Sequence, residues 1–358
     1  MKPAFDSHCH YHLFDLSIEE EANILKEEFE YTHTKKNCFL GIPQHINHNG
    51  NVEFDPIHNI RGIFFKEYFS PNSYTFAGLV HPKEHNNIKE LQDDFLKQVK
   101  KYFDMGFDGM KMIEGYPTFI KYTGLGIDSP AFDKFYDFCE KNSFPIIMHI
   151  ANPDENWDIS KASKEAIKQG RVYDSSFPTK EEITNQLFKL LNKHPNLTLI
   201  VAHFGFFSEH YEDAIKYMSY PNTYLDTTPG GEQFINMSKN WSLWLPFFDK
   251  YQDRIIYGTD FYPFKKDENW LVSFNRRPKF LREFFETNTK HIYLGEEFKG
   301  IKLDENILEK IYMKNAEKLL GNPRTINKKK VLEEIAKTDK TKLNVREKED
   351  LDYIEQHL

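Results

Sequence analysis

The sequence has little of several features that mark large classes of protein. Its 358 residues include only three cysteines, Cys9, Cys38 and Cys139, with no CxxC pair, so no disulfide framework is expected. No uninterrupted apolar run approaches the roughly 18 residues that a membrane-spanning helix needs. No signal-like apolar stretch precedes Asp6 either. We therefore expect reduced thiols, no membrane association and a cytoplasmic location.

Positive charge is scarce as well. The chain carries 47 basic against 55 acidic side chains, for a formal net charge of -8. Such a chain has no basic field to attract a phosphate backbone, so nucleic acid is excluded as a partner and a small-molecule substrate is expected.

Eight short apolar runs alternate with stretches that have helical spacing of apolar residues. This alternation predicts parallel strands joined by helices, and eight such strands close a (β/α)8 TIM-type barrel. The alternative is a doubly wound open sheet, but that fold should show a glycine-rich phosphate turn after an early strand, and none is present. The predicted strands are 4–9, 38–42, 75–80, 107–113, 145–150, 197–202, 223–225 and 254–257.

The predicted organisation is a single barrel domain over residues 1–322, followed by a charged, solvated or loosely docked helical tail over 323–358. Two connections, 151–178 and 262–277, are longer than usual βα loops. Both would overhang the C-terminal mouth of the barrel, where active sites of this fold lie.

Metal-competent side chains end four of the predicted strands. His8 and His10 are two residues apart in the first strand, so they face one side together, and Asp6 shares that parity. Three later runs stop on His149, His203 and Asp260. A barrel brings its strand ends into one ring, so these groups can surround one divalent ion with a position left open for water.

At this point the sequence resembles the amidohydrolase superfamily of metal-dependent hydrolases, in the amidohydrolase-2 branch related to aminocarboxymuconate-semialdehyde decarboxylase. The resemblance covers most of residues 1–321. It rests on Asp6-Ser-His8-Cys-His10, Met148-His149-Ile-Ala-Asn-Pro153 with Trp157, the segment from His194 to Gly205 that contains Val-Ala-His203-Phe-Gly, Tyr220-Pro-Asn-Thr-Tyr-Leu-Asp226, Tyr257-Gly-Thr-Asp260-Phe, and Asn315-Ala-Glu-Lys-Leu-Leu-Gly321.

The resemblance implies roles for these residues. His8, His10, His149 and Asp260 would be metal ligands, and Asp260 would also handle protons. His203 would be either a ligand of a second metal or a catalytic group beside a single metal. Lys111 falls where two-metal members carry a carboxylated lysine bridge, and Glu114 three residues on is its alternative. A homodimer is expected at the level of the family.

The predicted function is metal-dependent hydrolysis of an amide, ester or lactone bond of a small molecule, because a bound divalent ion lowers the pKa of its water from about 16 to about 7. Asp260 would take the proton and His203 would stabilise the oxyanion. The alternative is non-oxidative decarboxylation of a conjugated or aromatic acid, and a third reading is a non-catalytic metal-binding or ligand-binding barrel. Zinc is the default ion, with manganese, iron or nickel as alternatives and one or two ions per chain. Arg171 is a candidate substrate-binding residue, and Arg276 and Arg277 in the last long connection are further candidates for binding an anion.

Overall fold

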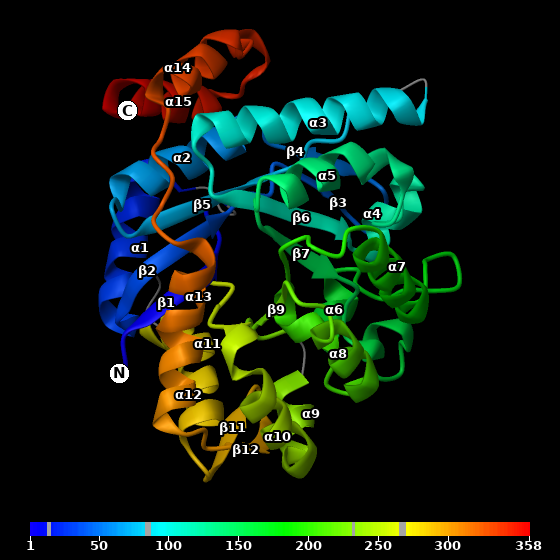
Figure 1. Ribbon diagram of the computed structural model, residues 1–358. Coiled ribbons are helices and arrows are strands. Elements are labelled where there is room, and N and C mark those ends of the chain that lie inside the picture. The colour runs from blue at the N-terminus through cyan, green and yellow to red at the C-terminus, as the bar shows by residue number, and fades with distance from the viewer. Residues whose placement is uncertain (13–15, 83–86, 231–232, 265–269) are drawn as a thin grey trace.

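The computed structural model describes residues 1–12, 16–82, 87–230, 233–264 and 270–358. Its centre is an eight-stranded sheet in the order β1-β2-β5-β6-β7-β8-β9-β10, and every hydrogen-bonded neighbour is parallel (Figure 1). This arrangement confirms the predicted (β/α)8 barrel. The strands are β1 (Ala4–Cys9), β2 (Thr34–Leu40), β5 (Ser73–Gly78), β6 (Gly109–Gly115), β7 (Ile146–Ile150), β8 (Leu199–Val201), β9 (Thr223–Asp226) and β10 (Ile255–Ile256).

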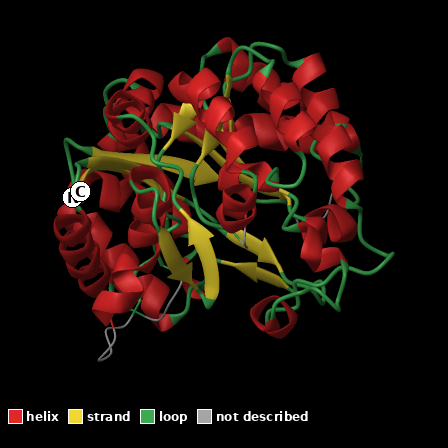
Figure 2. Ribbon diagram, turned by 90° about the horizontal axis from the view of Figure 1, so that it is seen from below, coloured by secondary structure: helices red, strands yellow, loops and turns green. Residues whose placement is uncertain are grey.

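Helices surround the sheet on its outer side (Figure 2). Capping boxes fix two of their starts: Ser17 precedes α1 and pairs with Glu20 in its first turn, and Thr179 precedes α7 and pairs with Glu182 in its first turn. The helices that follow or precede the barrel strands are α1 (Ile18–Thr32), α2 (His58–Tyr68), α3 (Ile88–Met105), α4 (Pro117–Thr123), α5 (Asp133–Lys141), α6 (Lys164–Lys168), α7 (Lys180–Lys193), α8 (Tyr211–Met218), α9 (Gln233–Lys239), α10 (Trp241–Tyr251), α11 (Trp270–Glu286), α12 (Glu305–Glu309) and α13 (Asn315–Leu320).

The barrel closes between β1 and the segment that follows β10. Asp260 N–H donates to His8 C=O at 2.8 Å, and His10 N–H donates to Phe261 C=O at 2.6 Å. Gly258 allows this close approach, because a Cβ there would lie 2.9 Å from the Cβ of His8. The seam therefore places the first and last predicted metal ligands beside each other.

Two antiparallel hairpins lie outside the barrel sheet. One is formed by β3 (Gln44–Ile46) and β4 (Val52–Phe54), and the other by β11 (Lys290–Tyr293) and β12 (Glu296–Lys299). Residues of β3, of the turn after β11 and of the long loop after β7 all line one cavity, described below. These insertions build the outer wall of the barrel mouth.

The C-terminal tail packs on the barrel more closely than the charged sequence led us to expect. It contains α14 (Lys328–Lys337) and α15 (Val345–His357), which contact α3 and α2 respectively. Val331, Leu351 and Ile354 are fully buried. Asp350 accepts a hydrogen bond from Arg61 Nε at 2.9 Å, which ties the tail to the barrel helix α2.

The core is made of aliphatic and aromatic side chains from the strands and the inner faces of the helices. The strands are buried along most of their length, as expected for a parallel sheet covered by helices. Among the described helices, no segment combines the length and the apolar character that crossing a membrane requires.

Candidate metal centre and active-site cavity

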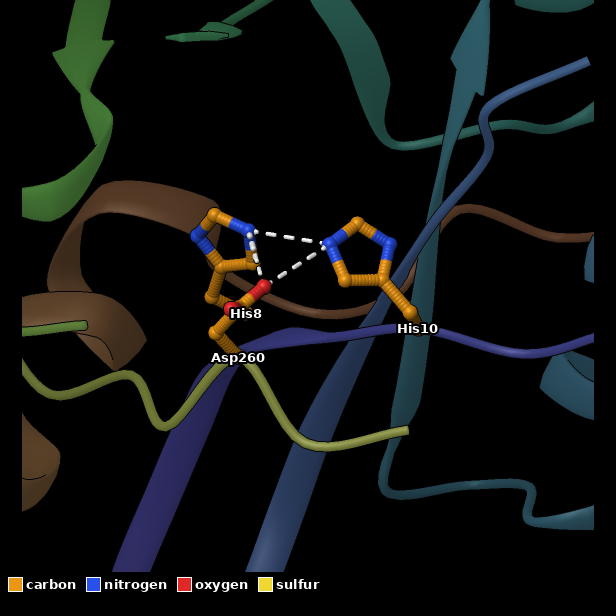
Figure 3. Close-up of side chains that lie close together, drawn as sticks. All are labelled: His8, His10 and Asp260. Atoms are coloured by element: carbon orange, nitrogen blue, oxygen red, sulfur yellow. Dashed lines mark hydrogen bonds and ion pairs between the residues drawn. The ribbon is translucent and has the colours of Figure 1, made fainter. Parts of the chain in front are cut away.

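Three of the predicted ligands meet at the barrel seam. One ligand atom each from His8, His10 and Asp260 lies within 4.8 Å of the others (Figure 3). His10 Nε2 is 3.2 Å and His8 Nε2 is 3.6 Å from Asp260 Oδ1, and the two Nε2 atoms are 3.2 Å apart. The residues come from opposite ends of the chain, and the closure of the barrel brings them together.

Hydrogen bonds orient both imidazoles toward this point. His8 Nδ1 lies 2.7 Å from Asp226 Oδ2, and His10 Nδ1 lies 3.0 Å from the Leu40 carbonyl oxygen. Each acceptor takes an Nδ1–H donor, so in the neutral form of each ring, which is the form that binds a metal, Nε2 carries a lone pair. Two lone pairs and a carboxylate facing one another repel unless a cation lies between them. The donor set therefore fits a divalent metal ion.

The charges around the three residues support the same conclusion. Burial, followed by the Lys111 ammonium, holds the pKa of His8 well below its ordinary value, so the ring is neutral. Burial alone would raise the pKa of Asp260, but the Arg277 guanidinium and the neighbouring imidazoles hold it well below its usual range. A neutral imidazole and an ionised carboxylate are the states that bind a metal.

Asp260 is held by contacts on both sides. Arg277 NH1 lies 3.0 Å from Asp260 Oδ2, which leaves Oδ1 to face the two histidines. The backbone of Asp260 has φ 56°, and the preceding Thr259 donates its N–H and hydroxyl to Asp6. The Asp6 carboxylate is therefore turned to Thr259, although the strand parity predicted that it would share the side of His8 and His10.

His149 and Lys111 lie near the three residues but are arranged differently. His149 is not part of the group whose ligand atoms lie within 4.8 Å of one another. Its Nε2 lies 2.9 Å from the Ala151 carbonyl oxygen, and its ring stacks on Tyr116 with centroids 4.1 Å apart. Lys111 Nζ lies 3.4 Å from His8 Nε2, and burial lowers the pKa of this lysine to about 8.

Glu114 points to another partner. Its Oε1 lies 3.1 Å from His81 Nε2, in a buried pair that does not line the cavity. Three residues along a strand place a side chain on the opposite face, so Lys111 and Glu114 diverge. Lys111 is therefore the one of this pair that lies near the candidate metal ligands.

His203 follows β8 in a left-handed turn. The φ values of His203, Phe204, Gly205 and Phe206 are all between 51° and 64°. The ring of His203 has its centroid 5.5 Å from that of His8 and 4.9 Å from that of His149, and burial lowers its pKa to about 4. The turn thus presents a neutral imidazole beside the candidate metal ligands.

A cavity of about 860 Å³ opens onto all of these groups. His8, His10, Asp260, Lys111, His149 and His203 line it, together with Arg171 from the long connection after β7 and Arg276 and Arg277 from α11. Residues of both predicted long connections therefore reach the barrel mouth, but the second connection is helical from Trp270 on. Asp226 has close contacts in the site but was not assigned a role there from the sequence, although the parity of the β9 strand end was a signal for it. Arg277 was a candidate only for binding an anion, and nothing local marks it as the partner of Asp260.

Comparisons with known proteins identify the family of the chain. A family model described as Amidohydrolase matches residues 92–321, and the chain belongs to that family. It is therefore a metal-dependent enzyme of the amidohydrolase type. No match was found among curated protein sequences.

Solved structures share the fold at low sequence identity. A 2,6-dihydroxybenzoate decarboxylase from Rhizobium is 14% identical with a TM-score of 0.53, covering 89% of this chain and 99% of its own. A 4-oxalomesaconate hydratase from Rhodopseudomonas palustris is 11% identical with a TM-score of 0.51, covering 88% and 95%. A dihydroxybenzoic acid decarboxylase from Polaromonas with bound manganese and 2-nitroresorcinol is 14% identical with a TM-score of 0.51, covering 89% and 97%.

Proposed function

We propose that this protein is a metal-dependent hydrolase that cleaves an amide, ester or lactone bond of a small molecule. The observation that carries the proposal is the group of His8, His10 and Asp260, whose ligand atoms lie within 4.8 Å of one another at the wall of the cavity. Two imidazoles and one carboxylate suit zinc first, and manganese, iron and nickel are alternatives. A set of three protein ligands leaves room for a reacting molecule.

The residues of the chain divide the work of hydrolysis. A bound divalent ion supplies a Lewis acid that polarises a carbonyl group and acidifies water. Asp260 or the neutral His203 accepts a proton from the attacking water and returns it to the leaving amine or alcohol. Water adds to the acyl carbon, the bond to the leaving group breaks, and a carboxylic acid is released.

The roles that we propose for His149 and Lys111 each require a change from the arrangement seen in the structure. His149 can act as a further ligand only after Nε2 leaves the Ala151 carbonyl oxygen, 2.9 Å away. Lys111 can bridge two ions only after carboxylation of its amine, which the lowered pKa of about 8 favours because a neutral amine reacts with carbon dioxide.

Non-oxidative decarboxylation is the second candidate, and Arg277 is the observation that favours it. The guanidinium lies 3.0 Å from Asp260 Oδ2 and stabilises the ionised carboxylate. This stabilisation makes Asp260 a weaker base for the proton transfer that hydrolysis needs. Arg171, Arg276 and Arg277 also line the cavity, which suits a substrate with a carboxylate group. In this reaction a C–C bond breaks, carbon dioxide leaves, and a proton taken up from solvent and passed on by His203 Nε2 replaces it on carbon.

Metal content and reaction products test the proposal together. Protein purified without chelator is assayed for metal, then supplied with amide, ester, lactone and aromatic carboxylate panels in heavy-oxygen water. Hydrolysis predicts label in the product acid, whereas decarboxylation predicts release of carbon dioxide without label in the remaining product. A preparation that binds no divalent ion when titrated with zinc would overturn both candidates.

The expected homodimer also stays a proposal, which sedimentation of the purified chain would test. A monomer at micromolar concentration would contradict it.

A further inference from the structure

The fully buried Asp226, the last residue of β9, contacts both a candidate metal ligand and the candidate catalytic histidine. Its Oδ2 lies 2.7 Å from His8 Nδ1. Its Oδ1 accepts from the backbone N–H of His203 at 2.8 Å, from the backbone N–H of Thr228 at 3.1 Å, and from the Thr228 hydroxyl. The three contacts to Oδ1 come from N–H and O–H donors, which favour the ionised carboxylate, whereas burial raises the pKa of Asp226 above its ordinary 3.8.

The first arm of this network acts on His8. A neutral imidazole carries one N–H, and an ionised carboxylate accepts but cannot donate. The 2.7 Å contact therefore fixes the proton on Nδ1 and leaves the lone pair on Nε2. That lone pair faces His10 Nε2 at 3.2 Å and Asp260 Oδ1 at 3.6 Å, where a metal ion fits.

The second arm acts on His203 through a hydroxyl group. A threonine hydroxyl has one hydrogen to donate and two lone pairs. Thr228 donates its hydrogen to Asp226 Oδ1, so Oγ1 can only accept from His203, whose Nδ1 lies 3.2 Å away. His203 is then protonated on Nδ1 as well, and Nε2 is the nitrogen left to accept a proton in the reaction.

The same contacts hold the backbone of His203. Its N–H is shared between Asp226 Oδ1 at 2.8 Å and Thr228 Oγ1 at 2.9 Å, at the first residue of the left-handed turn. Gly230 leaves room for this turn, because a Cβ there would lie 3.0 Å from His203 Nδ1 and 2.6 Å from a ring carbon of Phe206. Left-handed non-glycine residues persist only where the surroundings fix them.

We propose that Asp226 is a positioning residue that selects the Nδ1–H form of two histidines at once, directly for His8 and through the Thr228 hydroxyl for His203. The inference deepens the proposed function, since it rests on His8 as a metal ligand and on His203 as a proton acceptor. It assigns Thr228 to the second arm alone.

The two arms can be broken separately. In Asp226→Asn the amide oxygen takes the place of Oδ1 and keeps the bonds to Thr228 and to the His203 backbone. The amide nitrogen then donates to His8 Nδ1 and forces the proton onto Nε2, the nitrogen that should bind the metal. Thr228→Val removes the hydroxyl that contacts His203 Nδ1, and with it the bond to Asp226 Oδ1 and one of the two acceptors of the His203 N–H, but it leaves the contact between Asp226 and His8 in place. Thr228→Ser restores the hydroxyl.

The test combines nitrogen NMR of metal-free, 15N-histidine-labelled protein with zinc titration. His8 and His203 signals are assigned by their loss in His8→Gln and His203→Gln. We expect both rings as Nδ1–H in the unsubstituted protein. Asp226→Asn should move the proton of His8 to Nε2 and weaken zinc binding by about 10–100-fold. Thr228→Val should change only the His203 signals, with zinc affinity within about threefold, and Thr228→Ser should restore them.

Several outcomes overturn the inference. One is a His8 signal of the Nε2–H form in the unsubstituted protein, which would count even if Asp226→Asn does not fold. Another is native zinc affinity in folded Asp226→Asn. Asp108→Asn controls for general loss of stability, because Asp108 is a buried aspartate bonded to Lys66 and contacts neither histidine. If the unsubstituted protein binds no zinc, the proposed function fails, while the NMR spectra still decide the tautomers.

Discussion

The histidines on the two sides of the barrel mouth are oriented differently by their hydrogen-bond partners. On the β1, β9 and β10 side, the Nδ1 atoms of His8 and His10 have acceptors, and their Nε2 atoms face Asp260. On the β6 and β7 side, His149 turns Nε2 to the Ala151 carbonyl oxygen instead. A strand end brings a histidine to the mouth, but its hydrogen-bond partners decide which nitrogen faces the centre.

The largest effect should follow from removing a ligand on the first side. We expect His10→Ala to weaken zinc binding by more than about 100-fold. Loss of a residue that only orients a ligand through a hydrogen bond typically weakens metal binding by about 10–100-fold. Calorimetric titration of metal-free protein measures this. His45→Ala is the matched control, because His45 lines the same cavity but lies outside the three-residue group. The zinc affinity of this variant should stay within about threefold of that of the unsubstituted protein. Equal losses in the two variants would contradict the assignment.

A smaller effect is expected on the second side. His149→Gln should weaken zinc binding by about tenfold, because binding through His149 requires loss of its hydrogen bond to Ala151. The same titration measures it. A loss as large as that in His10→Ala would show that His149 ranks with the first side, and would remove the distinction between the two sides.

Lys111 should have a still smaller effect on metal binding. We expect Lys111→Met to keep the metal stoichiometry of the unsubstituted protein and to change zinc affinity by less than about tenfold, since Nζ lies beside His8 Nε2 as a neighbour rather than as a ligand. Elemental analysis after zinc loading checks the stoichiometry. A fall from two ions to one would contradict this and support a carboxylated bridge.

The smallest expected effect is on protein stability and concerns Glu28. This buried carboxyl group contrasts with Asp226, which is also buried but accepts several hydrogen bonds. Glu28 on α1 is fully buried, and neither carboxyl oxygen has a hydrogen-bond partner among the described residues. Burial raises its pKa well above the ordinary 4.5, so the folded state keeps a proton that the unfolded chain loses. Its contribution to stability therefore falls as the pH rises above 4.5 and levels off above the raised pKa.

Glu28→Met removes this penalty. We expect the variant to gain about 1–3 kcal/mol in free energy of unfolding near neutral pH, with a smaller gain at about pH 4. Urea denaturation at both pH values measures it. Glu30→Met on the exposed side of the same helix should change stability little at either pH. A gain that grows toward acid pH would show that Glu28 is not the source.

The sequence was sufficient to predict the barrel and several of the strand-end residues that line its cavity. Apolar runs that end on His8, His149, His203 and Asp260 predicted which side chains reach the mouth, because the alternation of parallel strands and helices fixes where strand ends lie. The seam that joins β1 to the segment after β10 then follows from closure of the barrel.

The remainder depends on contacts that no local pattern encodes. The Asp6 carboxylate accepts from the N–H and hydroxyl of Thr259, in the segment after β10, and strand parity alone does not encode this contact. Arg277 approaches Asp260 from a helix beyond the last barrel strand. Ring orientations of His8 and His149 depend on acceptors supplied by Asp226 and Ala151, which the strand pattern does not reveal.

We expect one divalent ion to bind between His8, His10 and Asp260. A crystal structure of the zinc-loaded protein, with anomalous scattering at the zinc edge, would locate this ion. The anomalous peak should lie within coordinating distance of His8 Nε2, His10 Nε2 and an Asp260 carboxylate oxygen. A fully loaded protein with its zinc elsewhere, and no peak at these three atoms, would contradict it.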